Sequence, residues 1–184
     1  MAPRIRPLTP AELTPGQFAL YAAITAGPRA AGPQHFALTA EDGSLRGPFD
    51  ALLRSPAVGG AQQELGSAIR YRSGLTDRTR ELAILLVAAH QHSAFERDAH
   101  EAIARALGFT EAELLAIRAL DVSGFDECDR IIGRAVIELL DGDVSDATWA
   151  AASGSCGIDR FFDLTALVGY YMTLALQLRV FRVE

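Results

Sequence analysis

The chain has 184 residues, a formal net charge of −6 and an isoelectric point near 5.2, so it lacks the basic surface of a nucleic-acid-binding protein. Hydrophobic residues make up 49% of the sequence, which indicates a folded globular protein rather than a disordered one. All 17 cationic residues are arginine, which excludes imine chemistry on a lysine. We therefore expect a single domain over residues 1–184, with a small-molecule substrate and no nucleic-acid partner.

The cysteines and the apolar stretches predict a cytoplasmic protein. Cys128 and Cys156 are too far apart for a CxxC motif, and we expect both to be buried in a reducing compartment. The N-terminal ten residues lack the apolar core of a signal peptide. The longest apolar stretches, residues 82–89 and 164–176, are shorter than the roughly 20 residues that span a bilayer. No membrane partner is expected.

Residues 1–46 predict an N-terminal helix followed by a long loop. Thr9-Pro10 and Thr14-Pro15 are alternative helix starts, each with a threonine cap and a proline at the first helical position. Residues 27–48 are rich in glycine and proline and show no periodicity, which is typical of a surface loop. His35 lies in this loop and is a candidate functional residue because long loops often carry function.

Residues 47–120 contain the predicted core. A short helix is expected after Pro48, and Ser55-Pro56 begins a longer one. A helix is predicted over Asp77–Gln91, and its long apolar run should be buried on all sides. The next helix is predicted over Ala94–Leu107.

The remaining sequence continues the helical pattern. Thr110–Glu113 form a capping box for another helix. Residues 125–184 predict an amphipathic helix, a short helix capped by Ser145 and a long last helix that begins near Ile158. No segment shows the alternation that is typical of strands. The sequence therefore predicts an all-α protein with seven to nine helices.

Four polar residues accompany the buried helix: Glu81, Ser93, Glu96 and His100, at offsets of 0, 12, 15 and 19. Glu96 and His100 are four residues apart, so their side chains share one helix face. Folding the two helices together would bring Glu81 against the imidazole, and a carboxylate beside histidine makes it a usable acid or base. The competing interpretation is that Glu81 pairs with a nearby arginine and that His100 is a satisfied core residue.

A metal site is the less favoured alternative. His92, Glu96 and His100 form an H-x3-E-x3-H run with His90 close by, and these residue types bind Zn, Mn or Fe. Three ligands from successive turns of one helix are strained unless another segment helps. Ser93 lacks the glycines of a nucleophile elbow, and there is no phosphate-binding glycine loop. Our prediction therefore includes no metal and no cofactor.

The stretch RELAILLVAAHQHSAFERDAH resembles the carboxymuconolactone decarboxylase family, which shares the alkylhydroperoxidase D-like fold. The resemblance places Glu81, Ser93, Glu96 and His100 on the family's functional positions and implies a helical bundle. The peroxidase branch has cysteine at both middle positions, where this chain has Ser93 and Glu96. The decarboxylase-like branch typically has a YEWxxH-type motif, where this chain has FERDAH. The chain therefore resembles the decarboxylase-like branch without the CxxC.

The resemblance implies a lyase of aromatic catabolism that releases CO2 from a lactone or another small carboxylic acid by Glu/His acid–base chemistry. His100 would be the acid–base residue, Glu96 its coupled partner and Glu81 the group that orients the imidazole. The expected substrate contacts are Ser93, Arg80, Arg97 and His35. The alternatives are an alkylhydroperoxidase-like oxidoreductase relative that has lost its redox cysteines, a metal-dependent enzyme, and a non-catalytic binding protein on the same scaffold.

We also expect a homo-oligomer. The helix with the apolar run 82–89 and the last helix both have apolar residues on more than one face, and a partner should cover the surplus. Relatives of the fold that the chain resembles commonly assemble as trimers or dimers of trimers. A trimer or a hexamer is therefore the predicted assembly.

Overall fold

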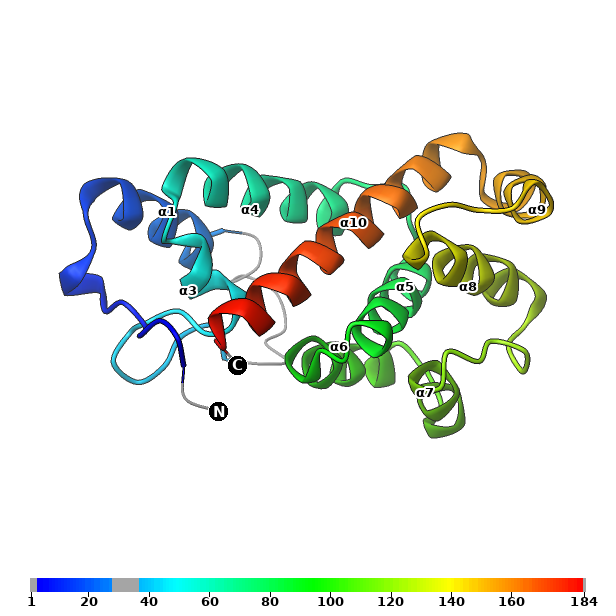
Figure 1. Ribbon diagram of the computed structural model, residues 1–184, viewed down its shortest axis with the longest axis horizontal. Helices are drawn as coiled ribbons and strands as arrows, with labels where there is room; N and C mark the ends of the chain where they lie inside the picture. The colour runs from blue at the N-terminus through cyan, green and yellow to red at the C-terminus, as the bar shows by residue number, and fades with distance from the viewer. Residues whose placement is uncertain (1–2, 28–36, 184) are drawn as a thin grey trace. The chain divides into compact units, whose positions relative to one another are not determined.

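The computed structural model describes residues 3–27 and 37–183, and within these ranges the protein is all-helical (Figure 1). The described residues contain no β-strand, although Thr39 and Leu45 form an isolated antiparallel bridge. The helices, in chain order, are the 3-10 helix η1 (Pro10–Glu12) and the α-helices α1 (Pro15–Thr25), α3 (Pro48–Leu52), α4 (Pro56–Tyr71), α5 (Asp77–His90), α6 (Ala94–Ala106), α7 (Glu111–Arg118), α8 (Glu127–Leu140), α9 (Asp146–Cys156) and α10 (Ile158–Phe181). The all-α prediction is confirmed. His35 lies outside the described residues.

Local sequence signals set most helix starts. Thr14 and Gln17 form a capping box at the start of α1, whereas Thr9 begins only the short η1. The Thr110 capping box begins α7, and Ser145 caps α9, both as predicted. These caps satisfy backbone N–H groups that have no partner within the helix.

The chain divides into two compact units. One consists of residues 1–68 and 176–184, and the other of residues 69–175. This division describes compactness rather than independent folding. The single domain and the segment boundaries expected from the sequence therefore stay predictions.

The first unit has a small core of its own. Leu20 and Ile24 of α1 pack with Phe49 and Leu52 of α3. Asp50 is 1% exposed, and its carboxylate accepts a hydrogen bond from the backbone amide of Leu8 and pairs with Arg54 in α3's following turn. A buried carboxylate with such partners is tolerated.

The second unit is built around α5. All nine residues from Arg80 to Ala88 are buried, and α5 packs against α6, α7 and α8 (Figure 1). The prediction of a helix buried on all sides is therefore confirmed. The predicted ranges Asp77–Gln91 and Ala94–Leu107 each extend one residue beyond α5 and α6, into the capping positions.

The last helix is longer than the apolar stretch 164–176 noted in the sequence. α10 has 24 residues and an 18-residue stretch of mean hydropathy 1.3, so its length and composition would allow it to cross a membrane. It is the one helix of the described residues that meets this test. Leu164, Leu167 and Leu174 of α10 belong to the core of the second unit. A core helix of a folded protein passes the same test, so the finding is weak evidence for a membrane span.

The expectation that both cysteines are buried is wrong. Cys128 is exposed and Cys156 is partly exposed. Cys128 lies in the first turn of α8, and its Sγ atom is 3.9 Å from Oγ of Ser155. Both thiols line one small surface pocket at the ends of α8 and α9. Apolar composition alone does not reveal that a helix end reaches the surface.

Candidate functional site

A Schellman motif joins α5 to α6 and positions the site. The amide of Ser93 donates to the carbonyl of Ala88 at 2.9 Å, and the amide of His92 donates to that of Ala89 at 3.2 Å. His92 takes the left-handed conformation that the motif requires, with φ of 53°. The chain therefore reverses within three residues, and α6 packs back along α5.

This reversal brings Glu81 of α5 against His100 of α6. Oε2 of Glu81 is 2.6 Å from Nδ1 of His100, a short charge-assisted hydrogen bond. Glu81 is 0% and His100 is 5% exposed. Because the contact is buried, water screens it little.

Glu96 lies on the other side of the same ring. Its Oε2 atom is 3.4 Å from Nε2 of His100, one helical turn further along α6. Each ring nitrogen therefore faces a carboxylate. The Oε1 atoms of Glu81 and Glu96 are buried and accept no hydrogen bond from the described residues. Buried carboxylate oxygens without partners are costly, which is typical of a position that receives a ligand or water.

The two carboxylates control the protonation of His100. Burial lowers the pKa of the imidazole, but the charges and hydrogen bonds of Glu81 and Glu96 outweigh it and raise the pKa to about 9. Burial raises the pKa of Glu81, but His100, Arg70 and Arg80 outweigh it and lower that pKa. At neutral pH the site therefore holds an imidazolium between carboxylates.

Two arginines lie on the far side of Glu81. Nε of Arg80 is 3.5 Å and Nη1 of Arg70 is 3.9 Å from Oε1 of Glu81. Both distances exceed an ordinary hydrogen bond, so the arginines act on Glu81 through charge. Glu81 thus pairs with nearby arginines and with His100 together.

The ring of Tyr171 forms one wall of the site. It meets the His100 ring edge-on, with centroids 5.4 Å apart at an angle of 86°, and Tyr170 packs edge-on against Tyr171. Burial, with the nearby Glu96 charge, raises the pKa of the Tyr171 phenol well above its usual value. Tyr171 therefore stays neutral and keeps its proton.

In a comparison with known protein families, residues 56–126 match the model of the carboxymuconolactone decarboxylase family. The match includes α5, α6 and the Glu81–His100 pair. The similarity to this family is therefore carried by the segment that contains the candidate site.

A solved structure shares the fold of this chain. It is a protein of unknown function from Agrobacterium tumefaciens, for which a role as the antioxidant defence protein AhpD has been suggested. The TM-score is 0.64 and the sequence identity 18%, over 71% of this chain and 92% of that chain. This likeness shows the fold, which is alkylhydroperoxidase D-like. No curated protein matches the chain.

The other predicted site residues lie in different surroundings. Ser93 is 7% exposed, and its hydroxyl does not cap α6, so the hydroxyl is available to a ligand. Arg80 is buried and adjoins the cluster. The guanidinium of Arg97 is not brought to the cluster, because it pairs with the exposed Asp98. His35 lies outside the described residues.

The metal alternative gains no support from the geometry. His92 is exposed in the turn before α6, so it does not share the helix face of Glu96 and His100. Within residues 3–27 and 37–183, no group of three or more His, Cys, Asp or Glu side chains is arranged to hold a metal ion. The H-x3-E-x3-H spacing had suggested one continuous helix, and the left-handed residue interrupts it.

Sequence reasoning missed Arg70 and Tyr171. Arg70 is in the last turn of α4, 11 residues before Glu81, and a turn separates them. Tyr171 follows His100 by 71 residues, and only the packing of α10 brings them together. Neither contact has a signal in local spacing.

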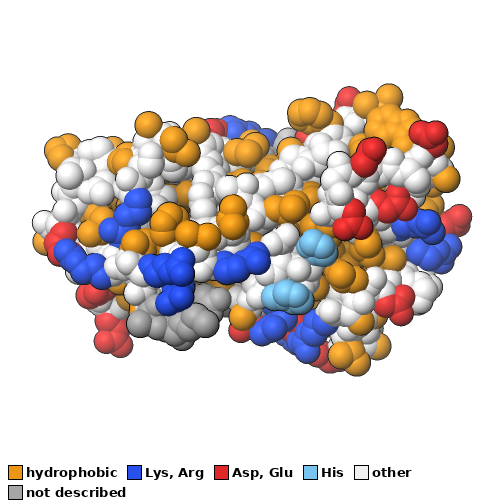
Figure 2. Space-filling view, viewed as in Figure 1, with side chains coloured by type: hydrophobic (Ala, Val, Ile, Leu, Met, Phe, Trp, Pro, Cys, Tyr) orange, Lys and Arg blue, Asp and Glu red, His pale blue; other side chains and the backbone are white. Residues whose placement is uncertain are grey.

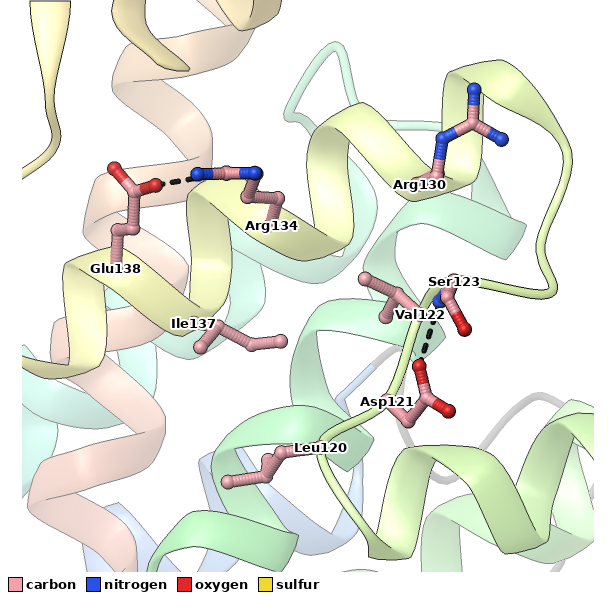
Figure 3. A pocket seen from close by; sticks show the side chains of 8 residues that line it. All are labelled: Leu120, Asp121, Val122, Ser123, Arg130, Arg134, Ile137 and Glu138. Atoms are coloured by element: carbon pink, nitrogen blue, oxygen red, sulfur yellow. Dashed lines mark hydrogen bonds and ion pairs between the residues drawn. The ribbon is translucent and has the colours of Figure 1, made fainter. Parts of the chain in front are cut away.

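A separate open cavity of about 420 Å³ lies beside α8 in the second unit (Figure 3). Leu120, Val122 and Ile137 supply its apolar lining, and Arg134 at its rim pairs with Glu138. None of the cluster residues lines this cavity. Arg134 and Glu138 are already paired, and Arg130 donates to the backbone carbonyl of Phe125, so the cavity is not the candidate site.

Proposed function

We propose that the protein is a lyase that releases CO2 from a lactone or a related small carboxylic acid. The observation that carries this proposal is the His100 imidazolium, 2.6 Å from Glu81 and 3.4 Å from Glu96. Loss of CO2 leaves an electron pair on carbon that must be protonated, and an imidazolium is a proton donor at neutral pH. The family match, in a segment that includes all three residues, supports the same chemistry.

The two ring nitrogens have different tasks in this proposal. Glu81 holds the proton on Nδ1 through the 2.6 Å contact and orients the ring. The contact between Nε2 and Glu96 is 3.4 Å, longer than an ordinary hydrogen bond, so the proton on Nε2 is the one that a substrate can take. Glu96 then accepts a proton from water and returns it to Nε2.

The reaction runs in two steps. The bond between the substrate and its carboxylate breaks, CO2 leaves, and the electron pair moves into the neighbouring unsaturated carbonyl group. Nε2 of His100 then gives its proton to carbon and becomes neutral. Burial of the site excludes water and strengthens each of these charge interactions. Ser93 would contact the substrate through its uncommitted hydroxyl.

Thiol chemistry is not proposed for this site. A dithiol peroxidase needs a thiolate and a resolving thiol close to each other. The corresponding positions here are Ser93 and Glu96. The name of the Agrobacterium protein therefore does not transfer to this chain as an activity.

The test is CO2 release from carboxylated lactones of aromatic-ring degradation. We expect His100→Gln to reduce the rate by about 10²–10⁴-fold, the usual contribution of a general acid. Glu101→Gln is the matched control, because Glu101 is the next residue, is 5% exposed and pairs with Arg118 instead. Retention of the rate in His100→Gln would overturn the proposal.

A non-catalytic binding protein is the second candidate. The near-complete burial of Glu81, Glu96 and His100 favours it, because a site with so little open surface suits a small bound ligand as well as a reacting one. Tight binding of a lactone acid without CO2 release would support this candidate instead.

The proposal also includes a cytoplasmic homo-oligomer, a trimer or a hexamer. The second unit exposes large apolar side chains, 41% for Trp149, 68% for Ile158 and 71% for Phe162. Hydrophobic side chains are visible across the surface in Figure 2. Exposed apolar groups of this size favour burial against a partner subunit.

A further inference from the structure

We propose that Cys128 and Cys156 form a second reactive site of this protein, a dithiol that exchanges with small disulfides. The two thiols line one cavity of about 70 Å³ in the second unit. None of the residues Glu81, Glu96 and His100 lines this cavity. The inference therefore goes beyond the proposed function and does not depend on it.

Helix packing brings the two cysteines together. Cys128 is the second residue of α8 and Cys156 is the last residue of α9, and these two helices pack against each other. Sγ of Cys128 is 3.9 Å from Oγ of Ser155, the residue that precedes Cys156. Gly157 has a φ of 83° and ends α9, so Cys156 lies at a helix end, which opens more easily than a helix interior. Both thiols are therefore placed to react in turn with one bound molecule.

The surroundings of the thiols suit one end of a small disulfide. Buried apolar side chains form part of the lining, and hydroxyl groups and one cation complete it. The apolar residues are Leu75, Ile132 and Leu164, the hydroxyl groups belong to Thr76, Thr79 and Ser155, and the cation is Arg160. The cavity is much smaller than the roughly 300 Å³ of a cofactor pocket, so it accepts a group of a few heavy atoms.

The two thiols differ in exposure, which gives them different roles. Cys128 is exposed, so a disulfide in solution reaches its sulfur directly. Cys156 is partly exposed and packs against the core of the second unit. Burial raises the pKa of the Cys156 thiol despite the opposing charge of Arg160. Because the thiolate is the nucleophile in exchange, Cys128 attacks first and Cys156 is the resolving thiol.

The exchange consists of two steps. The Cys128 thiolate attacks one sulfur of the disulfide R–S–S–R, forms a mixed disulfide and releases R–S⁻, which takes up a proton. Cys156 then gives its proton to water, and its sulfur attacks the Cys128 sulfur and releases the second R–S⁻. The protein loses two electrons and two protons, and the small disulfide gains them as it becomes two thiols.

A metal site is the rival interpretation of two neighbouring cysteines. Structural zinc sites have four protein ligands. Over the described ranges 3–27 and 37–183, no three His, Cys, Asp or Glu side chains are grouped so as to hold a metal ion. Apart from the two thiols, the cavity is lined by hydroxyl groups, an arginine and aliphatic side chains. This lining favours exchange over metal binding.

Reaction of the reduced protein with hydroxyethyl disulfide, a small neutral probe, tests the assignment. Intact-mass measurement after acid quenching should show a wild-type protein that is two hydrogens lighter and carries no added group, because Cys156 closes the disulfide. Cys156→Ser should instead keep one hydroxyethylthio group, which peptide mapping places on Cys128. Cys128→Ser should react at least about tenfold more slowly than Cys156→Ser, because burial shields its remaining thiol and holds the proton on it.

The same variants in denaturant are the control for the role of the fold. Unfolding removes the difference in burial, so Cys128→Ser and Cys156→Ser should then react at rates within about twofold of each other. A tenfold difference that persists in denaturant would contradict the roles assigned to the two thiols. If Cys156→Ser does not fold, Cys156→Ala replaces it, because alanine keeps an apolar group against the core.

Three results would overturn the dithiol site. The first is a wild-type protein that keeps hydroxyethylthio groups on both cysteines instead of closing the disulfide. The second is a disulfide between two chains, seen as a covalent dimer on a non-reducing gel. The third is a Cys128→Ser variant that reacts as fast as Cys156→Ser in the folded state. None of these results bears on CO2 release, so the lyase proposal is tested separately.

Discussion

Replacing Glu81 by glutamine would remove the charge that keeps His100 protonated and leave the shape of the site almost unchanged. Oε2 of Glu81 is 2.6 Å from Nδ1 of His100, and both residues are buried. Without this carboxylate, only Glu96 would oppose burial, which lowers the pKa of the imidazole. We therefore expect the His100 pKa to fall from about 9 toward or below its ordinary value of 6.5.

The raised pKa of His100 makes the unfolding free energy depend on pH, and it sets the sign and size of that dependence. Below pH 6.5 the imidazole is protonated in both the folded and the unfolded protein, so its stabilising contribution is fully present. Between pH 6.5 and about 9 only the folded protein keeps the proton, so the contribution is lost as the pH rises. At about 1.4 kcal/mol per pH unit, the loss is about 3 kcal/mol of unfolding free energy.

Denaturant unfolding at pH 6.5, 8 and 9.5 measures this loss. Glu81→Gln should abolish the alkaline loss that His100 causes. The matched control is Glu101→Gln, which also removes a buried carboxylate from the second unit but breaks a pair with Arg118 and Arg105. It should lower stability by a similar amount at all three pH values, because arginine stays charged throughout.

A wild-type unfolding free energy that is flat from pH 6.5 to 9.5 would refute this reasoning. So would a Glu81→Gln variant that keeps the wild-type slope. The flat profile would mean that His100 is neutral in the folded protein and is not an acid at neutral pH. The unchanged slope would mean that Glu81 is not the group that holds the proton on His100.

Three further predictions concern the site, the core and the assembly. The protein should not reduce hydroperoxides in a thiol-dependent cycle at this site, and thiol-dependent turnover that Ser93→Ala abolishes would contradict us. Leu86→Ala should cost about 2–5 kcal/mol of unfolding free energy, because Leu86 is fully buried in α5. Leu115→Ala, at a side chain that is 66% exposed, should change the unfolding free energy by less than about 0.5 kcal/mol in the same denaturant titration. Sedimentation should give a mass of about three or six subunits, and a mass near 19.7 kDa would exclude the oligomer.

Local patterns in the sequence predicted most of the helices. The capping boxes at Thr14 and Thr110 begin helices, since a cap depends only on neighbouring backbone and side-chain atoms. The apolar run in α5 predicted burial on all sides, because a helix with apolar side chains on every face is stable in water only when other helices surround it. Local patterns failed at His92, where the left-handed turn breaks a spacing that looks continuous in sequence.

The sequence by itself determined the helical class, the α5–α6 pair and the convergence of Glu81, Glu96 and His100. Helix periodicity and a short connection leave few ways to arrange two adjacent helices, so residues near their ends and faces can be placed in advance. Only the tertiary structure decided the neighbours of that cluster. Arg70 of α4 lies near Glu81, and Tyr171 of α10 packs against His100. Arg97 pairs with Asp98 and not with a residue of the cluster. Contacts between helices that are distant in the chain depend on how side chains fill the core, and the spacing of residues within one segment does not predict this packing.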